Sequence, residues 1–118
     1  MTITELQQKA HRTAKEHGFW ENFPYDSTWH HFVASKLALV HAEVSEALEE
    51  VRRAIWPGDL VAGAIREDGK PEGFASELAD IIIRVLDLAE GLDLNLEPML
   101  EHKMAFNETR EHRHGKAL

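Results

Sequence analysis

The chain has 118 residues and 43% hydrophobic content, which suits one domain with one hydrophobic core. Its 21 acidic and 13 basic residues give a formal net charge of -8, which argues against a broad grip on the phosphate backbone of nucleic acid. The absence of cysteine excludes disulfides and thiolate metal sites, so any metal must take oxygen or imidazole ligands.

The amino terminus and the hydropathy pattern indicate where the protein works. Residues 1–5 show no basic-then-apolar signal pattern, and no apolar run approaches the length of a membrane-spanning helix. We therefore expect a cytoplasmic protein with no membrane partner. A folded chain this short also exposes a large share of its surface, which favours association with further copies of itself.

The first predicted helix is short. Thr2 and Glu5 form a capping-box pattern, and apolar residues then recur at helical spacing until Gly18. Residues 19–26 place four aromatic side chains around a proline, which breaks the helical period. We interpret this segment as a structured connection.

The second predicted helix is long. Ser27 or Thr28 can cap its start, and the Trp-Pro-Gly sequence at residues 56–58 ends it. One apolar stripe runs along it, formed by Val33, Leu37, Val40, Val44, Ala47, Leu48, Val51 and Ile55. Residues 57–73 then carry four glycines and two prolines, which predicts a long irregular loop.

Two more helices are predicted in the second half of the chain. The third spans Phe74 to Gly91 and has apolar residues around most of its circumference, so we expect it to be largely buried. Asn95 caps a fourth helix that continues toward Arg110. Residues 111–118 are predicted to form a flexible tail.

The elements together define the expected fold class. No strand-like alternation, internal repeat or low-complexity tract is present, so four helices in one compact layer are the simplest packing. We predict an all-α fold, a four-helix bundle formed by residues 1–118 as a single domain.

Pairs of carboxylates one turn apart carry the chemistry. On the second helix Glu43, Glu46 and Glu50 share one narrow sector, and on the third Glu77 and Asp80 lie among apolar residues. A bundle that packs the two helices together brings the two pairs into one cluster. Such a cluster repels itself unless it is protonated or neutralised, and a hard cation such as Mg²⁺ or Mn²⁺ is the usual solution. For Glu50, an ordinary solvated helix face is the competing interpretation.

A second stripe of polar residues lies on the fourth helix. Lys103, Asn107 and Arg110 follow one another at steps of four and three, so all three project from one face. Lysine and arginine can bind phosphate oxygens, and asparagine can orient a phosphate or a base edge. An ordinary surface stripe explains the same pattern.

The ordered set of motifs on successive helices resembles the MazG-like all-α nucleoside triphosphate pyrophosphatases. The resemblance covers about residues 36–116. It rests on Glu43-Val-Ser-Glu46, then Glu77-Leu-Ala-Asp80, then Lys103 with Asn107 and Arg110. Each motif is weak alone, but their order along the chain is more specific.

The resemblance implies a fold and an activity. It implies a MazG-like bundle completed by oligomerisation, as a homodimer or homotetramer, and Mg²⁺-dependent hydrolysis of a nucleoside triphosphate to the monophosphate and pyrophosphate, as a nucleotide-pool housekeeper. By matching motif, the metal ligands are Glu43, Glu46, Glu77 and Asp80, and the contacts to phosphate or nucleotide are Lys103, Asn107 and Arg110.

One departure from the family pattern concerns the general base. Many relatives carry two adjacent glutamates at the start of the first motif, whereas this chain has Ala42 before Glu43. Branches that resemble dCTP and dUTP pyrophosphatases lack that residue too. The water is then activated by the metal or by a ligand such as Glu46, and Glu50 is another candidate.

Aromatic residues are candidates for recognising the base. Trp20, Trp56, Trp29 and His30 can stack on or hydrogen-bond to a nucleobase. Packing in the core or in an oligomer interface is the alternative role for each of them.

Two other functions remain open at this point. A phosphoribosyl-ATP pyrophosphohydrolase shares the helices, acids and magnesium but acts on a different nucleotide. A non-catalytic helical binding or assembly protein uses the same acids as a solvated surface and predicts no stabilisation by metal. A di-iron centre is rejected, because it needs Glu-x-x-His on each of two helices and only Glu111 to His114 fits.

Overall fold

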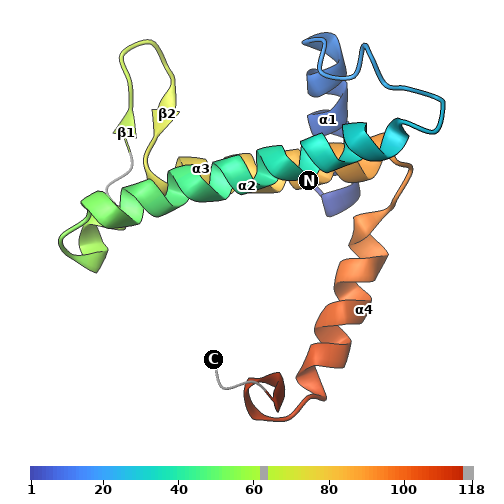
Figure 1. The fold of residues 1–118 in the computed structure, drawn as a ribbon. Coiled ribbons are helices and arrows are strands. Elements are labelled where there is room, and N and C mark those ends of the chain that lie inside the picture. The colour runs from blue at the N-terminus through green and yellow to red at the C-terminus, as the bar shows by residue number, and fades with distance from the viewer. Residues whose placement is uncertain (62–63, 116–118) are drawn as a thin grey trace.

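The computed structural model describes residues 1–61 and 64–115. Within them lie four α-helices: α1 (Ile3–Glu16), α2 (Trp29–Arg53), α3 (Phe74–Gly91) and α4 (Leu96–Glu108). The predicted all-α class is therefore confirmed (Figure 1). No helix in the described parts of the chain is both long and apolar enough to cross a membrane.

Local sequence signals set the helix ends. The Thr2 hydroxyl accepts a hydrogen bond from the Glu5 backbone N–H, and the Glu5 carboxylate accepts one from the Thr2 N–H, so the predicted capping box is present. Asn95 caps α4 as predicted, because its side chain accepts a hydrogen bond from the Glu97 N–H. Thr28 is the N-cap of α2 by position, but its N–H and hydroxyl both donate to Asp26 instead of capping the helix.

Residues 57–61 and 64–73 contain regular structure within the stretch predicted as a long irregular loop. They include a 3₁₀ turn, η1 (Pro57–Leu60), and a small antiparallel hairpin of β1 (Ala64–Ile65) and β2 (Pro71–Glu72). Gly69 closes the hairpin with a φ of 86°, and its N–H donates to the Arg66 carbonyl at 2.8 Å. Strands of two residues give no alternating pattern, so the sequence carries no strand signal here.

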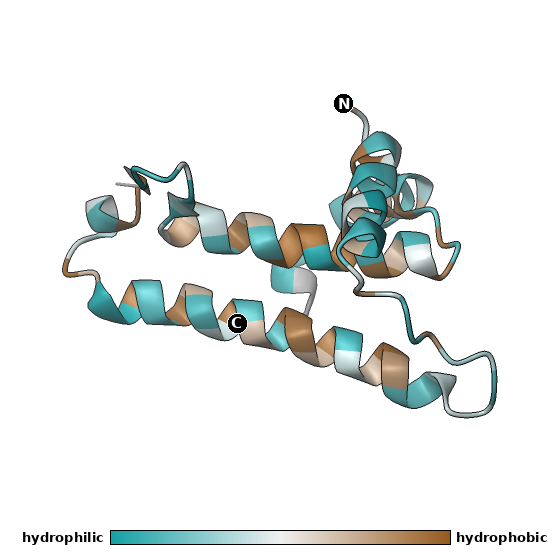
Figure 2. Cartoon of the chain, turned by 90° about the horizontal axis from the view of Figure 1, so that it is seen from above, coloured by the Kyte–Doolittle hydropathy of each residue, from teal (hydrophilic) through white to brown (hydrophobic). Residues whose placement is uncertain are grey.

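The core forms where α1 crosses the end of α3. Helices α2 and α3 run side by side along their length, and α1 lies across the carboxyl-terminal half of α3 (Figure 2). This half of α3 holds four consecutive buried residues, Leu86, Asp87, Leu88 and Ala89. The expected burial of α3 is therefore confined to the crossing.

Gln7 joins α1 to the connection between α3 and α4. Its side chain is 1% exposed, and its Nε2 donates to Glu90 at 2.8 Å and to the Leu94 carbonyl at 2.6 Å. Its Oε1 accepts a hydrogen bond from the Leu96 N–H at 3.2 Å. The amide therefore satisfies backbone groups at the start of α4.

Helix α4 extends away from the α2–α3 pair (Figure 1). The radius of gyration is 17.0 Å, whereas a compact chain of this length has one of about 13.5 Å. The single chain is thus not the compact layer that we expected, and its four helices do not close into a bundle. The tail holds a short turn, η2 (His112–Gly115), and residues 116–118 of the predicted flexible tail lie outside the described residues.

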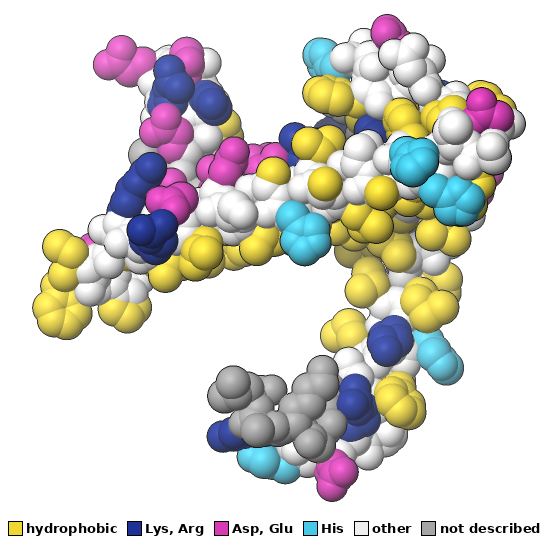
Figure 3. Space-filling model, viewed as in Figure 1, with side chains coloured by type: hydrophobic (Ala, Val, Ile, Leu, Met, Phe, Trp, Pro, Cys, Tyr) yellow, Lys and Arg dark blue, Asp and Glu magenta, His cyan; other side chains and the backbone are white. Residues whose placement is uncertain are grey.

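Large apolar side chains remain exposed on three helices (Figure 3). On α2 they are Trp29, Leu37, Leu39, Val44, Leu48 and Val51; on α3 they are Leu78, Ile82, Ile83 and Val85; and on α4 they are Met99, Leu100, Met104 and Phe106. A chain that buries so little apolar surface by itself has much to gain from covering these faces.

Candidate functional site

Helices α2 and α3 bring three of the predicted ligands together. One carboxylate oxygen from each of Glu43, Glu77 and Asp80 lies within 4.8 Å of the other two. Glu43 is only 8% exposed. Because three like charges at this separation repel one another, the site favours protonation or a bound cation.

Glu46 adjoins this cluster through Glu77. The Glu77 pKa is raised, first by burial and then by the Glu46 carboxyl group beside it, with Asp80 and Glu43 adding to the effect. Among the residues that the structure describes, none donates a hydrogen bond to the buried Oε2 of Glu77. Two carboxylates can share a hydrogen bond only if one is protonated, so Glu77 lacks a partner when both are charged.

Two cations lie near the carboxylates. The Arg84 Nε donates to Glu43 Oε1 at 2.7 Å. Burial, followed by the charge of Glu43, raises the pKa of Asp80, and the positive charges of Arg84 and Lys70 oppose this rise. Arg84 comes one turn after Asp80 on α3, whereas Lys70 comes from the hairpin. We did not assign either as a site residue from the sequence.

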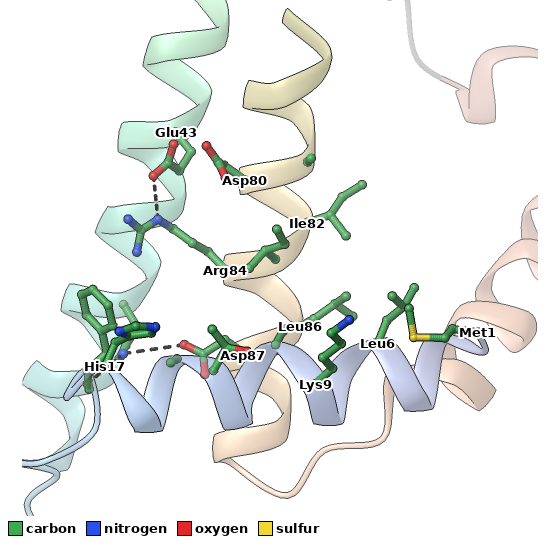
Figure 4. Close-up of a pocket in the computed structure, with 17 residues that line it drawn as sticks. Met1, Leu6, Lys9, His17, Glu43, Asp80, Ile82, Arg84, Leu86 and Asp87 are labelled. Atoms are coloured by element: carbon green, nitrogen blue, oxygen red, sulfur yellow. Dashed lines mark hydrogen bonds and ion pairs between the residues drawn. The ribbon is translucent and has the colours of Figure 1, made fainter. Parts of the chain in front are cut away.

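A pocket of about 630 Å³ adjoins the cluster. Glu43, Asp80 and Arg84 belong to its wall, as do apolar residues of α1 and α3 such as Leu6 and Leu86 (Figure 4). Pockets of this volume with apolar walls and few polar groups are typical of small-molecule sites. A ligand in the pocket can therefore contact the carboxylate cluster at one end.

A buried polar network adjoins the pocket, and two of its members, Lys36 and Asp87, belong to the pocket wall. Asp87 accepts hydrogen bonds from the Trp20 Nε1 and the His11 Nδ1, each at 2.8 Å. The Lys36 Nζ lies 3.7 Å from the other Asp87 oxygen and donates to the Phe19 carbonyl at 3.0 Å. Burial lowers the pKa of Lys36, and the charge of Asp87 opposes this effect. The network ties α1, α2 and α3 together.

The ring of Trp20 packs against other side chains of the protein. Its ring contacts His11, Phe23 and Phe32 at centroid distances of 4.9, 5.7 and 5.4 Å, and the Lys36 ammonium lies 4.4 Å from its centroid. It does not belong to the pocket wall. The structure therefore favours the packing role over base stacking for Trp20.

Other predicted site residues lie apart from the cluster. Glu50 is one turn beyond Glu46 on α2 and is not among the three converging carboxylates. Trp56 is 71% exposed at the end of α2 and is not in the pocket wall. Helix α4 extends from the other helices (Figure 1), so it carries Lys103 and Asn107 away from the site. Arg110 follows the end of α4 and is not in the pocket wall either.

The sequence gives only partial signals for three further residues in or beside the site, namely Arg84, Lys70 and Asp87. Arg84 follows Glu77 and Asp80 at helical spacing, so its presence near the acids was visible, but its bond to Glu43 depends on helix packing. Lys70 lies in an irregular segment without periodicity. Asp87 lies between two leucines on α3, which indicates a buried partner without naming it.

The clustered carboxylates fit a hard divalent cation. Magnesium and manganese prefer carboxylate oxygens, and the cluster offers three such groups from two adjacent helices. The buried Glu77 oxygen, to which no described residue donates, is the kind of atom that a cation satisfies.

The comparisons with known proteins identify no relative. No family model, no curated protein and no solved structure matches the chain.

Proposed function

We propose that this protein is a divalent-metal-dependent nucleotide pyrophosphohydrolase. The observation that carries the proposal is the convergence of Glu43, Glu77 and Asp80 beside a pocket of about 630 Å³, whose wall includes Glu43 and Asp80. A cation site beside an apolar pocket suits a ligand with a charged and a flat apolar part. A nucleoside triphosphate has this composition, and the resemblance to the MazG-like pyrophosphatases names the same substrate class.

Each part of the site has a role in this proposal. Glu43, Glu77 and Asp80 hold Mg²⁺ or Mn²⁺, and Glu46 is a further ligand beside Glu77. A bound cation supplies neutralisation of phosphate charge and an acidified water. The apolar pocket wall accepts the nucleoside. Glu46 is the most exposed of the four acids and is the candidate to accept the proton from water.

We also propose that the active form is a homodimer or homotetramer. The exposed apolar faces of α2, α3 and α4 are the surfaces that a second copy would cover. A partner's α4 can also bring cations to the site that its own chain does not. Lys103, Asn107 and Arg110 then keep the role of phosphate or nucleotide contacts.

The test is pyrophosphate release from canonical ribonucleoside and deoxynucleoside triphosphates, with magnesium and with EDTA. We expect release that EDTA abolishes, and a rate for Glu77→Gln that is lower by roughly a hundredfold. Glu49→Gln is the matched control, because Glu49 is exposed and pairs with Arg52 on the same helix. Activity retained in EDTA, or undiminished in Glu77→Gln, would refute the metal-dependent mechanism.

A non-catalytic assembly protein is the second candidate function. The observation in its favour is the large exposed apolar surface on three helices, which suits a scaffold that binds other chains. It predicts no cleavage of any triphosphate and no shift of the melting temperature with magnesium. Phosphoribosyl-ATP belongs in the same assay as a further substrate.

A further inference from the structure

Arg84 lies where the carboxylate cluster meets the pocket. It is on α3, one turn after Asp80, which corresponds to a rise of about 6 Å along the helix axis. Its side chain extends toward α2 and ends beside Glu43 (Figure 4). Both Glu43 and Arg84 line the pocket. A ligand that lies in the pocket against these carboxylates therefore has the guanidinium of Arg84 beside it.

Only one nitrogen of the Arg84 guanidinium donates a hydrogen bond to a described residue. Its Nε donates to Glu43 Oε1 at 2.7 Å, which holds the group beside α2. Among the described residues, none accepts a hydrogen bond from its Nη1 or Nη2. About a third of the side chain surface, 34%, is exposed. Two donors of a fixed fork are thus available at the pocket wall.

We propose that Arg84 binds the phosphate nearest the nucleoside and so sets the position of the scissile bond. The inference rests on the proposed function and adds a residue to it. A nucleoside in the apolar part of the pocket places its first phosphate beside Arg84, and the following phosphates extend toward the acids. The paired Nη donors match two oxygens of one phosphate group.

The bond to Glu43 gives this arrangement its rigidity. An arginine on a flexible surface loses side-chain entropy when it binds phosphate, whereas Arg84 is already held by Glu43, whose side chain alone is 11% exposed. The pair also leaves Glu43 Oε2 without a bond to Arg84, so one oxygen can serve a cation while the other holds the guanidinium. Arg84 therefore links the cation site to the substrate.

Isothermal titration calorimetry tests this role without turnover. The four ribonucleosides, the four deoxynucleosides and the 5′-monophosphates of each are titrated into the full chain in saturating magnesium. The measured quantity is the ratio of the two dissociation constants for each base, which isolates the contribution of the first phosphate. The variants are Arg84→Gln, Arg84→Lys and, as a control, Arg52→Gln, because Arg52 pairs with Glu49 on an exposed face.

We expect the monophosphate to bind the wild type more tightly than the nucleoside for at least one base. In Arg84→Gln this advantage falls by about tenfold or more, while nucleoside affinity stays unchanged. Arg84→Lys keeps the charge that pairs with Glu43 but has no fork, so it loses most of the same advantage. Arg52→Gln matches the wild type. The magnesium-induced shift in melting temperature is retained in every variant, which shows that the cation site is intact.

The outcomes separate the two proposals. If Arg84→Gln and Arg84→Lys keep the full phosphate advantage, the role of Arg84 is refuted and the pyrophosphohydrolase stands. If Arg84→Gln fails to fold, Arg84→Lys decides by the same ratio. A wild type that binds no nucleoside and no monophosphate overturns the proposed function together with this inference.

Discussion

Glu77 has a buried carboxylate oxygen beside other acids, and this makes its protonation depend on folding. Burial and the neighbouring Glu46 raise its pKa above the ordinary value of 4.5. The folded protein thus binds this proton more tightly than the unfolded chain does. The resulting stability is complete below pH 4.5 and is lost as the pH rises through the raised pKa.

We therefore predict that, in EDTA, the free energy of unfolding of the wild type relative to Glu77→Gln falls as the pH rises above 4.5. The glutamine cannot ionise, so the variant lacks this loss. Urea unfolding of both proteins at a series of pH values measures the difference. Magnesium should abolish the loss, because a cation replaces the proton. A difference that is independent of pH would show that Glu77 titrates alike in both states.

Asp87 is a second buried acid, but it has partners for its charge. It accepts bonds from Trp20 and His11 and lies 3.7 Å from the Lys36 ammonium. Removal of the carboxylate leaves a buried ammonium without its counter-ion.

We predict that Asp87→Ala lowers the free energy of unfolding by about 3 kcal/mol. Chemical denaturation followed by circular dichroism measures this loss. Asp68→Ala is the control, because Asp68 is 58% exposed and pairs with Arg66 on the hairpin. An equally small effect of both substitutions would mean that the network does not stabilise the fold.

At the scale of elements, Gly91 fixes how the aromatic connection packs against α3. A Cβ atom at this position would lie 2.2 Å from the Trp20 ring. Trp20 cannot move aside freely, because its Nε1 is bonded to Asp87 and its ring contacts Phe23 and Phe32.

Gly91→Ala should therefore destabilise the protein by about 2 kcal/mol, although alanine is the better helix former by about 1 kcal/mol. Thermal and urea unfolding measure the loss. Gly58→Ala is the matched control, since no atom of the described residues lies within 4 Å of the place that its Cβ would take, and the substitution should be nearly neutral. A Gly91→Ala variant as stable as the wild type would contradict this account of the packing.

The helix ends could be predicted from the sequence because their causes are local. The Thr2 capping box, the Asn95 cap and the end of α3 at Gly91 each depend on residues within one turn. The close approach of Trp20 to Gly91 could not be predicted, since it joins segments far apart in the chain. The hairpin around Gly69 could not be predicted either, because its two-residue strands are too short to show an alternating pattern.

The convergence of the carboxylates could also be predicted from the sequence, but the place of the α4 residues could not. Helical spacing places Glu43 on one face of α2 and Glu77 with Asp80 on one face of α3, so their convergence needed only the pairing of two helices. The position of Lys103 relative to them depends on where α4 lies. Nothing in the sequence of α4 determines this, because its exposed apolar residues specify a contact but not the chain that provides it.

At the scale of the whole molecule, the exposed apolar faces are the surfaces on which the proposed oligomer rests. The hydrophobic side chains left uncovered on α2, α3 and α4 are those that a folded monomer normally buries (Figure 3). Leu48, on α2, is 56% exposed and belongs to this surface. A second copy placed here would cover an apolar stripe along most of α2.

We predict that the wild type elutes as a dimer or tetramer and that Leu48→Lys shifts it toward the monomer, because the substitution places a charge in the apolar contact. Size-exclusion chromatography with light scattering, over a range of protein concentrations, measures the mass. Ala42→Lys is the control: Ala42 is exposed on a different face of the same helix, and the substitution adds the same charge. A monomeric wild type would refute the oligomer, whereas equal dissociation by both substitutions would assign the effect to net charge. If Leu48→Lys also loses pyrophosphate release while its helical content persists, the site depends on the partner chain.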